Sequence, residues 1–371
     1  MTDLIILGAS TRAAATSAWR AGWKPWCVDL FADADLERIA TVRKVAPEKY
    51  PEGLLDAIMD APQAPLIYTG ALENRPDLIA RIDRPLLGNP ADVLRAIRSP
   101  ERWTQCLRER GVPCPQIANE PVNSGDWLLK PRKSAAGIGI RAYDGQAFNA
   151  RTHFLQQRID GEPCSAVFLA TNGEATLLGV TQQLIGTRWL NADGFQYAGS
   201  IGPIFPMGDV LTRWRELGAA LAATFQLRGL FGVDVVMRHG IPWPVEINPR
   251  YTASVEVIER CWRGAAIEPP DGKPPLARNI ERLVSDTGIL WGKAIVFARQ
   301  TFFFPGNGPW LDALKDSADL DETEYADIPH AGEMIEQGKP VLTIFASGKS
   351  IEDCRRGLQE KAQDLDRRWW G

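Results

Sequence analysis

The chain has 371 residues, of which 45% are apolar and 24% charged, and its formal net charge is −4. This length allows two or three packed domains, and the composition is that of a globular protein rather than a disordered one. A slightly acidic chain has no excess of Lys and Arg to meet nucleic-acid phosphates, so no nucleic-acid partner is expected. The longest apolar runs fall short of the ~18 residues that cross a membrane, so no membrane association is expected either. Six cysteines without a C-x-x-C pair indicate reduced thiols in a cytoplasmic protein and no zinc site.

The first 95 residues have the pattern of a parallel sheet. An apolar run at Leu4–Leu7 precedes an Ala-rich helix that ends near Arg20, and a second apolar run follows at Pro25–Leu30. This order predicts a β-α-β unit, and Leu66–Thr69 predicts a further strand. The turn after the first strand reads Gly8-Ala9-Ser10 rather than G-x-G-x-x-G, so the dinucleotide fingerprint is absent.

A lysine-bearing strand and a loop of small residues follow a predicted helix at Ser99–Arg110. The strand is Trp127–Pro131, in which Lys130 is the charged residue, and the loop covers residues 132–139. A strand lysine can pair with a phosphate, and a loop of small residues lets backbone N–H groups approach the anion closely. The loop lacks the G-K-[ST] of a P-loop, and a surface hairpin turn fits the same letters.

The stretch Phe231–Ser254 predicts a β-hairpin that turns near Gly240. Alternation places one set of side chains on an apolar face: Phe231, Val233, Val235, Val245 and Ile247. Asp234, Glu246 and Asn248 fall on the other face, with Asp234 opposite Glu246 at roughly 5 Å. Two facing carboxylates repel each other unless a cation lies between them, and oxygen ligands of this kind suit Mg²⁺. An ordinary hairpin with a solvated acidic face fits the same pattern.

Other elements are predicted from periodicity and turn signals. A hairpin across Asn172-Gly173-Glu174 joins strands at Ala166–Ala170 and Ala175–Val180. The remaining predictions are helices at Arg213–Leu227, Val255–Arg263 and Ile351–Arg367 and strands at Gly292–Ala298 and Val341–Ala346.

Several of these stretches resemble the ATP-grasp superfamily. Asp234 followed by Glu246-Ile247-Asn248-Pro249-Arg250 is similar to the metal-binding hairpin of that family, and Gly111-Val112-Pro113-Cys114-Pro115 matches its turn after the helix. GASTRAA, VDLFADAD and TGALENRPDL resemble a subgroup of predicted ATP-dependent carboligases related to biotin carboxylase.

The resemblance implies an α/β and α+β chain with the ATP-grasp fold. A Rossmann-like preATP-grasp domain would cover residues 1–95, and the ATP-grasp domain 96–270, with its flap around 130–140 and its metal hairpin at 231–250. A small β-rich C-terminal domain would cover 280–371.

The resemblance also implies roles for individual residues. Asp234, Glu246 and Asn248 would hold Mg²⁺, with Mn²⁺ as a substitute, and Arg250 and Lys130 would face the phosphates as catalytic residues. The remaining ATP contacts would come from the flap (Ser134, Gly137, Gly139), from the adenine hinge (Gln156, Gln157, Ile159) and from Glu162 at the ribose. Arg188, Tyr197 and Ser200 are candidates for contact with the substrate. The family's basic residue at the helix start is replaced by Pro100, with Arg98 and Arg102 on either side, so that phosphate contact is unassigned.

The function implied is an Mg-ATP-dependent carboxylate–amine ligase that forms an amide through an acyl phosphate and releases ADP and phosphate. Its partners would be a small-molecule carboxylate and an amine such as glutamate or another amino acid, with a one-carbon carrier of the methanofuran or tetrahydromethanopterin type as the preferred product. A homodimer is possible. Two alternatives stay open: a bicarbonate-activating carboxylase, and an ATP-binding regulatory protein without ligase activity. The absence of the biotin carboxylase Q-V-E pattern right after Arg250 weakens the first, and the intact Asp-Glu-Asn set weakens the second.

Overall fold

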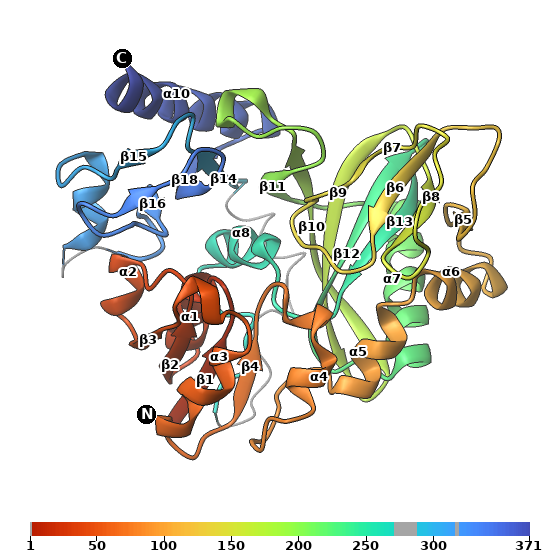
Figure 1. The fold of residues 1–371 in the computed structure, drawn as a ribbon, viewed down its shortest axis with the longest axis horizontal. Coiled ribbons are helices and arrows are strands. Elements are labelled where there is room, and N and C mark those ends of the chain that lie inside the picture. The colour runs from red at the N-terminus through yellow and green to blue at the C-terminus, as the bar shows by residue number, and fades with distance from the viewer. Residues whose placement is uncertain (1, 271–287, 316–318) are drawn as a thin grey trace.

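The structure is a computed structural model that describes residues 2–270, 288–315 and 319–371 (Figure 1). It begins with a parallel sheet of four strands in the order β3-β2-β1-β4. Its elements are β1 (Thr2–Leu7), α1 (Arg12–Arg20), β2 (Trp23–Asp29), α2 (Ala34–Glu37), β3 (Thr41–Lys44), α3 (Gly53–Ala57), β4 (Leu66–Tyr68), the 3₁₀ turn η3 (Leu72–Asn74), α4 (Pro76–Ile79) and α5 (Ala91–Ile97). The predicted β-α-β opening is confirmed, and Leu4–Leu7 is buried as expected for a covered parallel strand.

A small antiparallel sheet follows in the order β5-β8-β6-β7 and forms the lobe at the right of Figure 1. It is built from β5 (Ile117–Ala118), β6 (Trp127–Pro131), β7 (Arg141–Ala142) and β8 (His153–Gln157), preceded by α6 (Pro100–Glu109). Ser99 caps α6 by accepting from Arg102 N, so the helix predicted at Ser99–Arg110 begins one residue later, at Pro100. The lysine strand β6 has the predicted bounds.

A second antiparallel sheet runs through the rest of the chain in the order β13-β12-β9-β10-β11-β14-β18-β16. Its strands are β9 (Glu162–Thr171), β10 (Glu174–Ile185), β11 (Tyr197–Ile204), β12 (Gly229–Arg238), β13 (Ile241–Asn248), β14 (Leu290–Phe297), β16 (Tyr325–Ala326) and β18 (Pro340–Gly348). The strands after residue 288 therefore continue the sheet that holds the metal hairpin, through pairing of β11 with β14. The boundary predicted at 271–279 lies outside the described residues.

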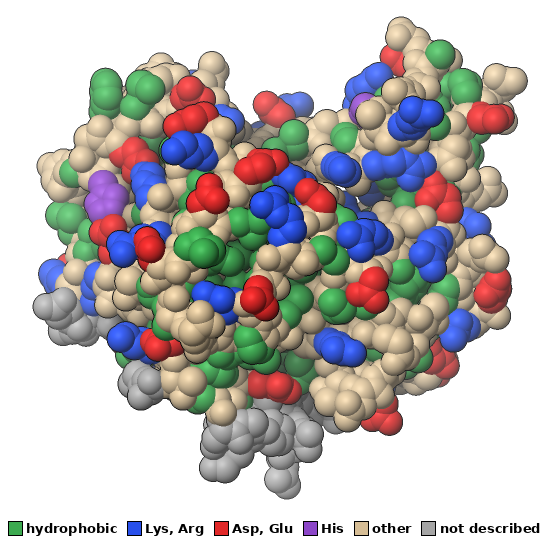
Figure 2. Space-filling model, turned by 60° about the horizontal axis from the view of Figure 1, so that its bottom comes forward, with side chains coloured by type: hydrophobic (Ala, Val, Ile, Leu, Met, Phe, Trp, Pro, Cys, Tyr) green, Lys and Arg blue, Asp and Glu red, His purple; other side chains and the backbone are tan. Residues whose placement is uncertain are grey.

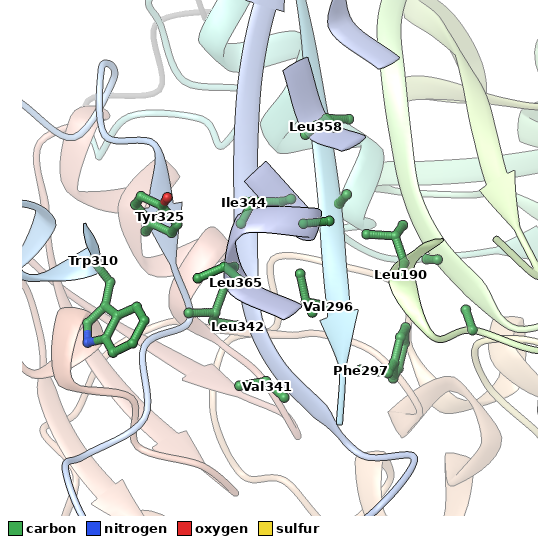
Figure 3. Close-up of a cluster of buried hydrophobic side chains, with 14 of the residues drawn as sticks. Leu190, Val296, Phe297, Trp310, Tyr325, Val341, Leu342, Ile344, Leu358 and Leu365 are labelled. Carbon is green, nitrogen blue, oxygen red and sulfur yellow. The ribbon is translucent and has the colours of Figure 1, made fainter. Parts of the chain in front are cut away.

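Three long helices lie against this sheet: α7 (Gly208–Phe225), α8 (Ala253–Trp262) and α10 (Ile351–Trp370). The helix predicted at Arg213–Leu227 begins five residues earlier, at Gly208. Near the C-terminus, Leu358 and Leu365 of α10 are fully buried in one hydrophobic cluster with Val296 and Ile344 of the sheet (Figure 3). The two-stranded pair of β15 (Phe302–Phe303) and β17 (Met334–Ile335) lies beside this part. None of the helices in the described ranges is long and apolar enough to cross a membrane.

The hairpin of β12 and β13 has the predicted register, since Asp234 lies directly opposite Glu246. Its turn uses left-handed backbone at His239 (φ 51°) and Gly240 (φ 71°), as a tight two-residue hairpin requires. The alternation that placed Val245 on one apolar face with Val233 and Val235 did not include a bulge. The register shifts after Asp234, so that Val235 lies opposite Pro244 and Val245 becomes the extra residue of a bulge.

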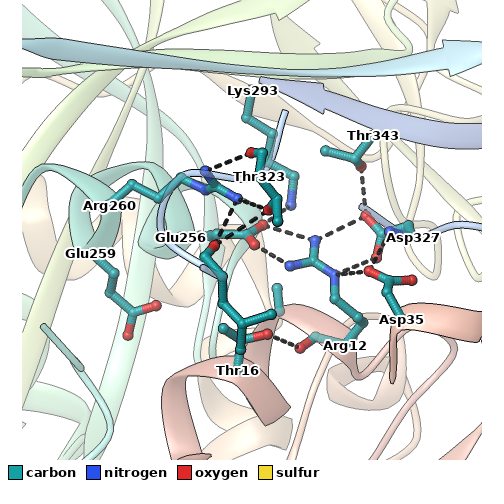
Figure 4. A network of polar contacts seen from close by, with 12 residues as sticks. Arg12, Thr16, Asp35, Glu256, Glu259, Arg260, Lys293, Thr323, Asp327 and Thr343 are labelled. Carbon is teal, nitrogen blue, oxygen red and sulfur yellow. Dashed lines mark hydrogen bonds and ion pairs between the residues drawn. The ribbon is translucent and has the colours of Figure 1, made fainter. Parts of the chain in front are cut away.

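A buried polar network joins the parallel sheet to α8 and to the C-terminal strands (Figure 4). Arg12, which begins α1, forms two hydrogen bonds with Glu256 of α8 and two of 3.0 Å with Asp327, which follows β16. Lys293 of β14 donates to Glu256 at 2.6 Å. Separation of the two sheets would leave these buried charges unpaired, which costs several kcal/mol. The network therefore fixes the parallel sheet relative to the large sheet.

Candidate active site

The two carboxylates of the hairpin lie close together and are partly shielded from solvent. Asp234 accepts hydrogen bonds from Gln183 Nε2 and Asn248 Nδ2, both at 3.0 Å. Burial, and then repulsion from Glu246, raise the pKa of Asp234 to about 6. A cation between the two carboxylates would remove that repulsion.

The donor set at the hairpin fits Mg²⁺. Over the described ranges of the chain, no three His, Cys, Asp or Glu side chains are grouped so that they could hold a metal ion. An ion at the hairpin would take two carboxylates, from Asp234 and Glu246, and the amide oxygen of Asn248 as its protein ligands. One or two carboxylates, with the other ligands taken from water and substrate phosphates, is the usual way in which proteins hold Mg²⁺.

Of the two arginines on either side of Pro100, Arg98 is the one that contacts the acid pair. Its Nη1 donates to Glu246 Oε1 at 3.0 Å, and its Nη2 donates to Asn74 Oδ1 at 2.8 Å. Arg102, the other candidate, is exposed on α6. The signal in the sequence was Arg98 directly before the Ser99 cap, where the chain enters α6 beside the hairpin.

Lys130 lies beside the acid pair with its ammonium group buried. Its Nζ donates to Gln156 Oε1 and to the carbonyl of Val245, both at 3.1 Å. Burial lowers the pKa of Lys130, while Glu246 acts in the opposite direction. Gln156 Nε2 donates to the same carbonyl at 3.1 Å. The bulge at Val245 thus provides the acceptor that both side chains use, and the carboxamide of Gln156 is engaged with Lys130.

Arg250 is held by Glu73, which the sequence analysis did not single out. Its Nε and Nη2 donate to the two oxygens of Glu73 at 2.9 and 2.7 Å, and Nη2 also lies 3.3 Å from Asn248 Oδ1. Glu73 is 1% exposed. Burial alone would raise the pKa of Glu73, but the Arg250 guanidinium outweighs burial and lowers it. The only signal in the sequence was the motif TGALENRPDL, to which no residue role was attached.

The predicted flap is folded against neighbouring segments. Ser134 O accepts from Asn74 Nδ2 at 3.0 Å, and Ala136 O accepts from Tyr197 N at 3.1 Å. Gly137 has left-handed backbone (φ 76°), and a Cβ at that position would lie 1.9 Å from Phe195 O. Only glycine fits at that contact. Gly139 is also left-handed, with φ 80°.

The hinge and ribose candidates lie on β8, in the link that follows it and at the start of β9. Gln157 N donates to Gln116 O at 2.9 Å, so this N–H is already bonded. Ile159 is buried. Glu162 is exposed and accepts a hydrogen bond from Gln182.

The substrate-contact candidates separate into two groups. Tyr197 OH lies 2.8 Å from Ser200 Oγ, which lies 3.2 Å from Ser254 Oγ at the start of α8. Arg188 is exposed in the 3₁₀ turn η4 (Arg188–Leu190).

Figure 2 shows a hollow between two projecting parts of the molecule, with Lys and Arg side chains gathered along the wall nearer the small-sheet lobe.

Comparison with known proteins finds a matching family model and a relative of similar length. Residues 101–254 match the family model described as the ATP-grasp domain. An uncharacterised protein of Methanocaldococcus jannaschii is 22% identical over 394 residues, which cover 98% of this chain and 93% of that protein.

Two solved structures share the fold along nearly the whole chain. An L-amino acid ligase from Bacillus licheniformis superposes with a TM-score of 0.68 at 13% identity, covering 98% of this chain and 97% of that one. The biotin carboxylase domain of 2-oxoglutarate carboxylase from Hydrogenobacter thermophilus, in complex with MgADP, ADP and bicarbonate, has a TM-score of 0.63 at 12% identity and covers 94% and 87%. Residues 101–254 therefore match the ATP-grasp domain, and the chain as a whole shares the fold of these two solved structures.

Proposed function

We propose that this protein is an Mg-ATP-dependent carboxylate–amine ligase. The observation that carries the proposal is the pair of facing carboxylates, Asp234 and Glu246, with Arg98, Lys130 and Arg250 around them. Three cations beside two carboxylates on one hairpin form a site for a polyphosphate that carries a divalent ion. The structurally similar biotin carboxylase domain from Hydrogenobacter thermophilus was solved with MgADP, which supports Mg²⁺ as the ion.

The reaction has two steps. A carboxylate oxygen of the first substrate attacks the γ-phosphorus of ATP, the bond to the β-bridging oxygen breaks, and ADP leaves. The amine nitrogen of the second substrate then attacks the acyl carbon, loses a proton to solvent, and phosphate departs with the C–O bonding electrons. Mg²⁺ would neutralise charge on the β- and γ-phosphates.

The residues of this chain bind and orient in both steps. Asp234, Glu246 and Asn248 would hold the ion. Lys130 and Arg250 place fixed positive charge where it is needed in the transition state, without reorganisation during the reaction. The flap, which packs against Phe195 and Tyr197 in this structure, excludes water that would hydrolyse the acyl phosphate.

The carboxylase alternative is less well supported. Glu256 is the first acidic residue after Arg250, and it is bound to Arg12 and Lys293 and 1% exposed. Although burial would raise its pKa, Arg12 and Lys293 hold the pKa of Glu256 well below its usual range. A carboxylate in that state is a poor base for bicarbonate. The regulatory alternative is opposed by the complete set of acidic and basic groups at the hairpin.

The amine substrate proposed is an amino acid, with glutamate first, and the carboxylate is a precursor of a one-carbon carrier of the methanofuran or tetrahydromethanopterin type. The likeness to an L-amino acid ligase supports the amino acid. The choice of a one-carbon carrier as substrate is supported only by the resemblance of the N-terminal sequence motifs to the carboligase subgroup.

The test is release of ADP and phosphate from Mg-ATP against a matrix of amino acids and carboxylate-bearing precursors, with Glu246→Gln as the control. Release that needs one carboxylate and one amine, and that disappears in the control, supports the ligase. AMP and pyrophosphate as products would refute the acyl phosphate. Release with bicarbonate in place of the organic carboxylate would favour the carboxylase.

A further inference from the structure

The dipeptide Glu73-Asn74 lies outside the segment that matches the ATP-grasp family model, but it contacts three parts of the candidate site. Glu73 binds Arg250, which follows the metal hairpin. Asn74 binds both the flap and Arg98. None of these three contacts is local in sequence, since the partners are 24 to 177 residues away.

Asn74 uses both ends of its side-chain amide, and each end has a different partner. Nδ2 donates to the carbonyl of Ser134 in the flap at 3.0 Å, and Oδ1 accepts from Arg98 Nη2 at 2.8 Å. Arg98 in turn donates from Nη1 to Glu246 at 3.0 Å. Because an amide can donate only from nitrogen and accept only at oxygen, both partners together require one orientation of Asn74. A continuous chain of hydrogen bonds therefore connects the flap with a carboxylate of the metal hairpin.

The backbone that presents this dipeptide is unusual. Ala71 has left-handed backbone at φ 72°, which is rare for a residue with a Cβ. It opens the 3₁₀ turn η3, in which Leu72 is buried and anchors the turn. Strained backbone persists where surrounding contacts over-determine it, and such positions concentrate at functional sites. Here the turn directs Glu73 and Asn74 toward the same site.

We propose that Asn74 is a positioning residue that couples the flap to Arg98. With the flap seated, Asn74 holds the Arg98 guanidinium against Glu246. With the flap lifted, the amide loses the Ser134 carbonyl and Arg98 loses an oriented partner. Seating of the flap over ATP and placement of the Arg98 charge therefore occur together. This role rests on the proposed function, because ATP is the ligand over which the flap seats.

Two substitutions separate the two bonds of Asn74. Asn74→Asp keeps an oxygen acceptor for Arg98 but removes the donor to Ser134, and Asn74→Ala removes both. Asn123→Asp introduces the same charge at an exposed position of another loop and is the matched control. Arg98→Lys, alone and combined with Asn74→Ala, tests whether the two residues act together.

The measurement is hydrogen exchange of the flap peptide 132–140 in the full chain, with Mg²⁺ and a non-hydrolysable ATP analogue, followed by kcat and KM for ATP. The analogue should slow hydrogen exchange of the flap in the wild type and in Asn123→Asp. In both Asn74 variants the factor by which it slows exchange should be about fivefold smaller, since one net hydrogen bond is worth about that factor. KM for ATP should rise about fivefold in Asn74→Asp with kcat retained, whereas Asn74→Ala should also lower kcat because Arg98 loses its partner.

Three results would overturn this role. If the analogue slows flap exchange in both Asn74 variants as much as in the wild type, Asn74 is not linked to the flap. Independent, additive costs of Asn74→Ala and Arg98→Lys would remove the link to Arg98. Failure of the analogue to slow exchange in the wild type would reject the proposed function, and this role with it, so the two failures are distinguishable.

Discussion

The guanidinium of Arg98 lies 3.0 Å from the carboxylate of Glu246, and this contact joins the start of α6 to the metal hairpin. Arg98 is therefore our candidate for the basic residue that Pro100 does not supply. The pair is partly exposed, with 16% and 28% of the two side chains accessible, so both groups can be reached by a ligand.

Removal of Arg98 should weaken ATP binding. Arg98→Ala should raise KM for ATP about ten- to a hundredfold, because a charge-assisted hydrogen bond is worth roughly 1.5–3 kcal/mol. Arg98→Lys should recover part of the loss, since it keeps the charge but not the planar fork. Steady-state kinetics with varied ATP checks both variants. Arg102→Ala is the control, and an equal effect there would contradict the assignment.

Loss of Glu73 should destabilise the fold. Glu73→Ala leaves the Arg250 guanidinium without its bidentate partner, at a cost of roughly 3 kcal/mol in the free energy of unfolding. The double variant Glu73→Ala/Arg250→Ala should lose less than the sum of the single changes. Urea denaturation measures all three. Glu48→Ala, at an exposed position, should change the free energy by less than about 0.5 kcal/mol.

The register at Asp234 and Glu246 could be predicted from the sequence, whereas the residues around the hairpin could not. Period-2 alternation and a Gly turn determine which residues face each other, so Asp234 and Glu246 were placed correctly. Pro242 and Pro244 lack N–H groups and lie on β13, the edge strand of the sheet, where a break in the ladder is tolerated. That break makes Val245 a bulge, and no alternation pattern indicates it.

Glu73 and Asn74 were missed, and Arg98 was not distinguished from Arg102, for a different reason. Their partners Arg250, Ser134 and Glu246 are brought to them by packing of the parallel sheet against the hairpin. A single sequence carries no signal for such distant pairs. The small motif around Glu73 could be recognised only as a resemblance, without a role for either residue.

Glu259 should make stability fall as pH rises through neutrality. It is fully buried on α8, where it accepts from Tyr251 OH at 2.9 Å and Ala266 N at 2.7 Å. Burial raises its pKa to about 7, although Arg20 acts in the opposite direction. A raised folded-state pKa stabilises the fold below the unfolded pKa of roughly 4.3, and this contribution is lost as pH rises through about 7.

The expected loss from Glu259 is up to roughly 3 kcal/mol between pH 4 and 8. Glu259→Gln cannot titrate, so the free energy of unfolding of this variant should vary less over that range. Denaturant titrations at several pH values measure the difference. If the free energy of unfolding changes equally with pH in the wild type and in Glu259→Gln, then Glu259 is not the source of the pH dependence.

Substitution of Gly137 should prevent the flap from seating. A Cβ there would lie 1.9 Å from the backbone oxygen of Phe195, which cannot move aside as a flexible side chain could. Gly137→Ala should therefore displace the flap, raise KM for ATP at least tenfold and increase ATP hydrolysis relative to amide formation, because water gains access to the acyl phosphate. Gly145→Ala is a matched control, since Gly145 is also left-handed (φ 85°) but a Cβ there meets no heavy atom within 4 Å. Equal effects of the two substitutions would attribute the loss to backbone strain alone, whereas a selective effect at Gly137 would establish that contact between the flap and the segment at Phe195 is needed for catalysis.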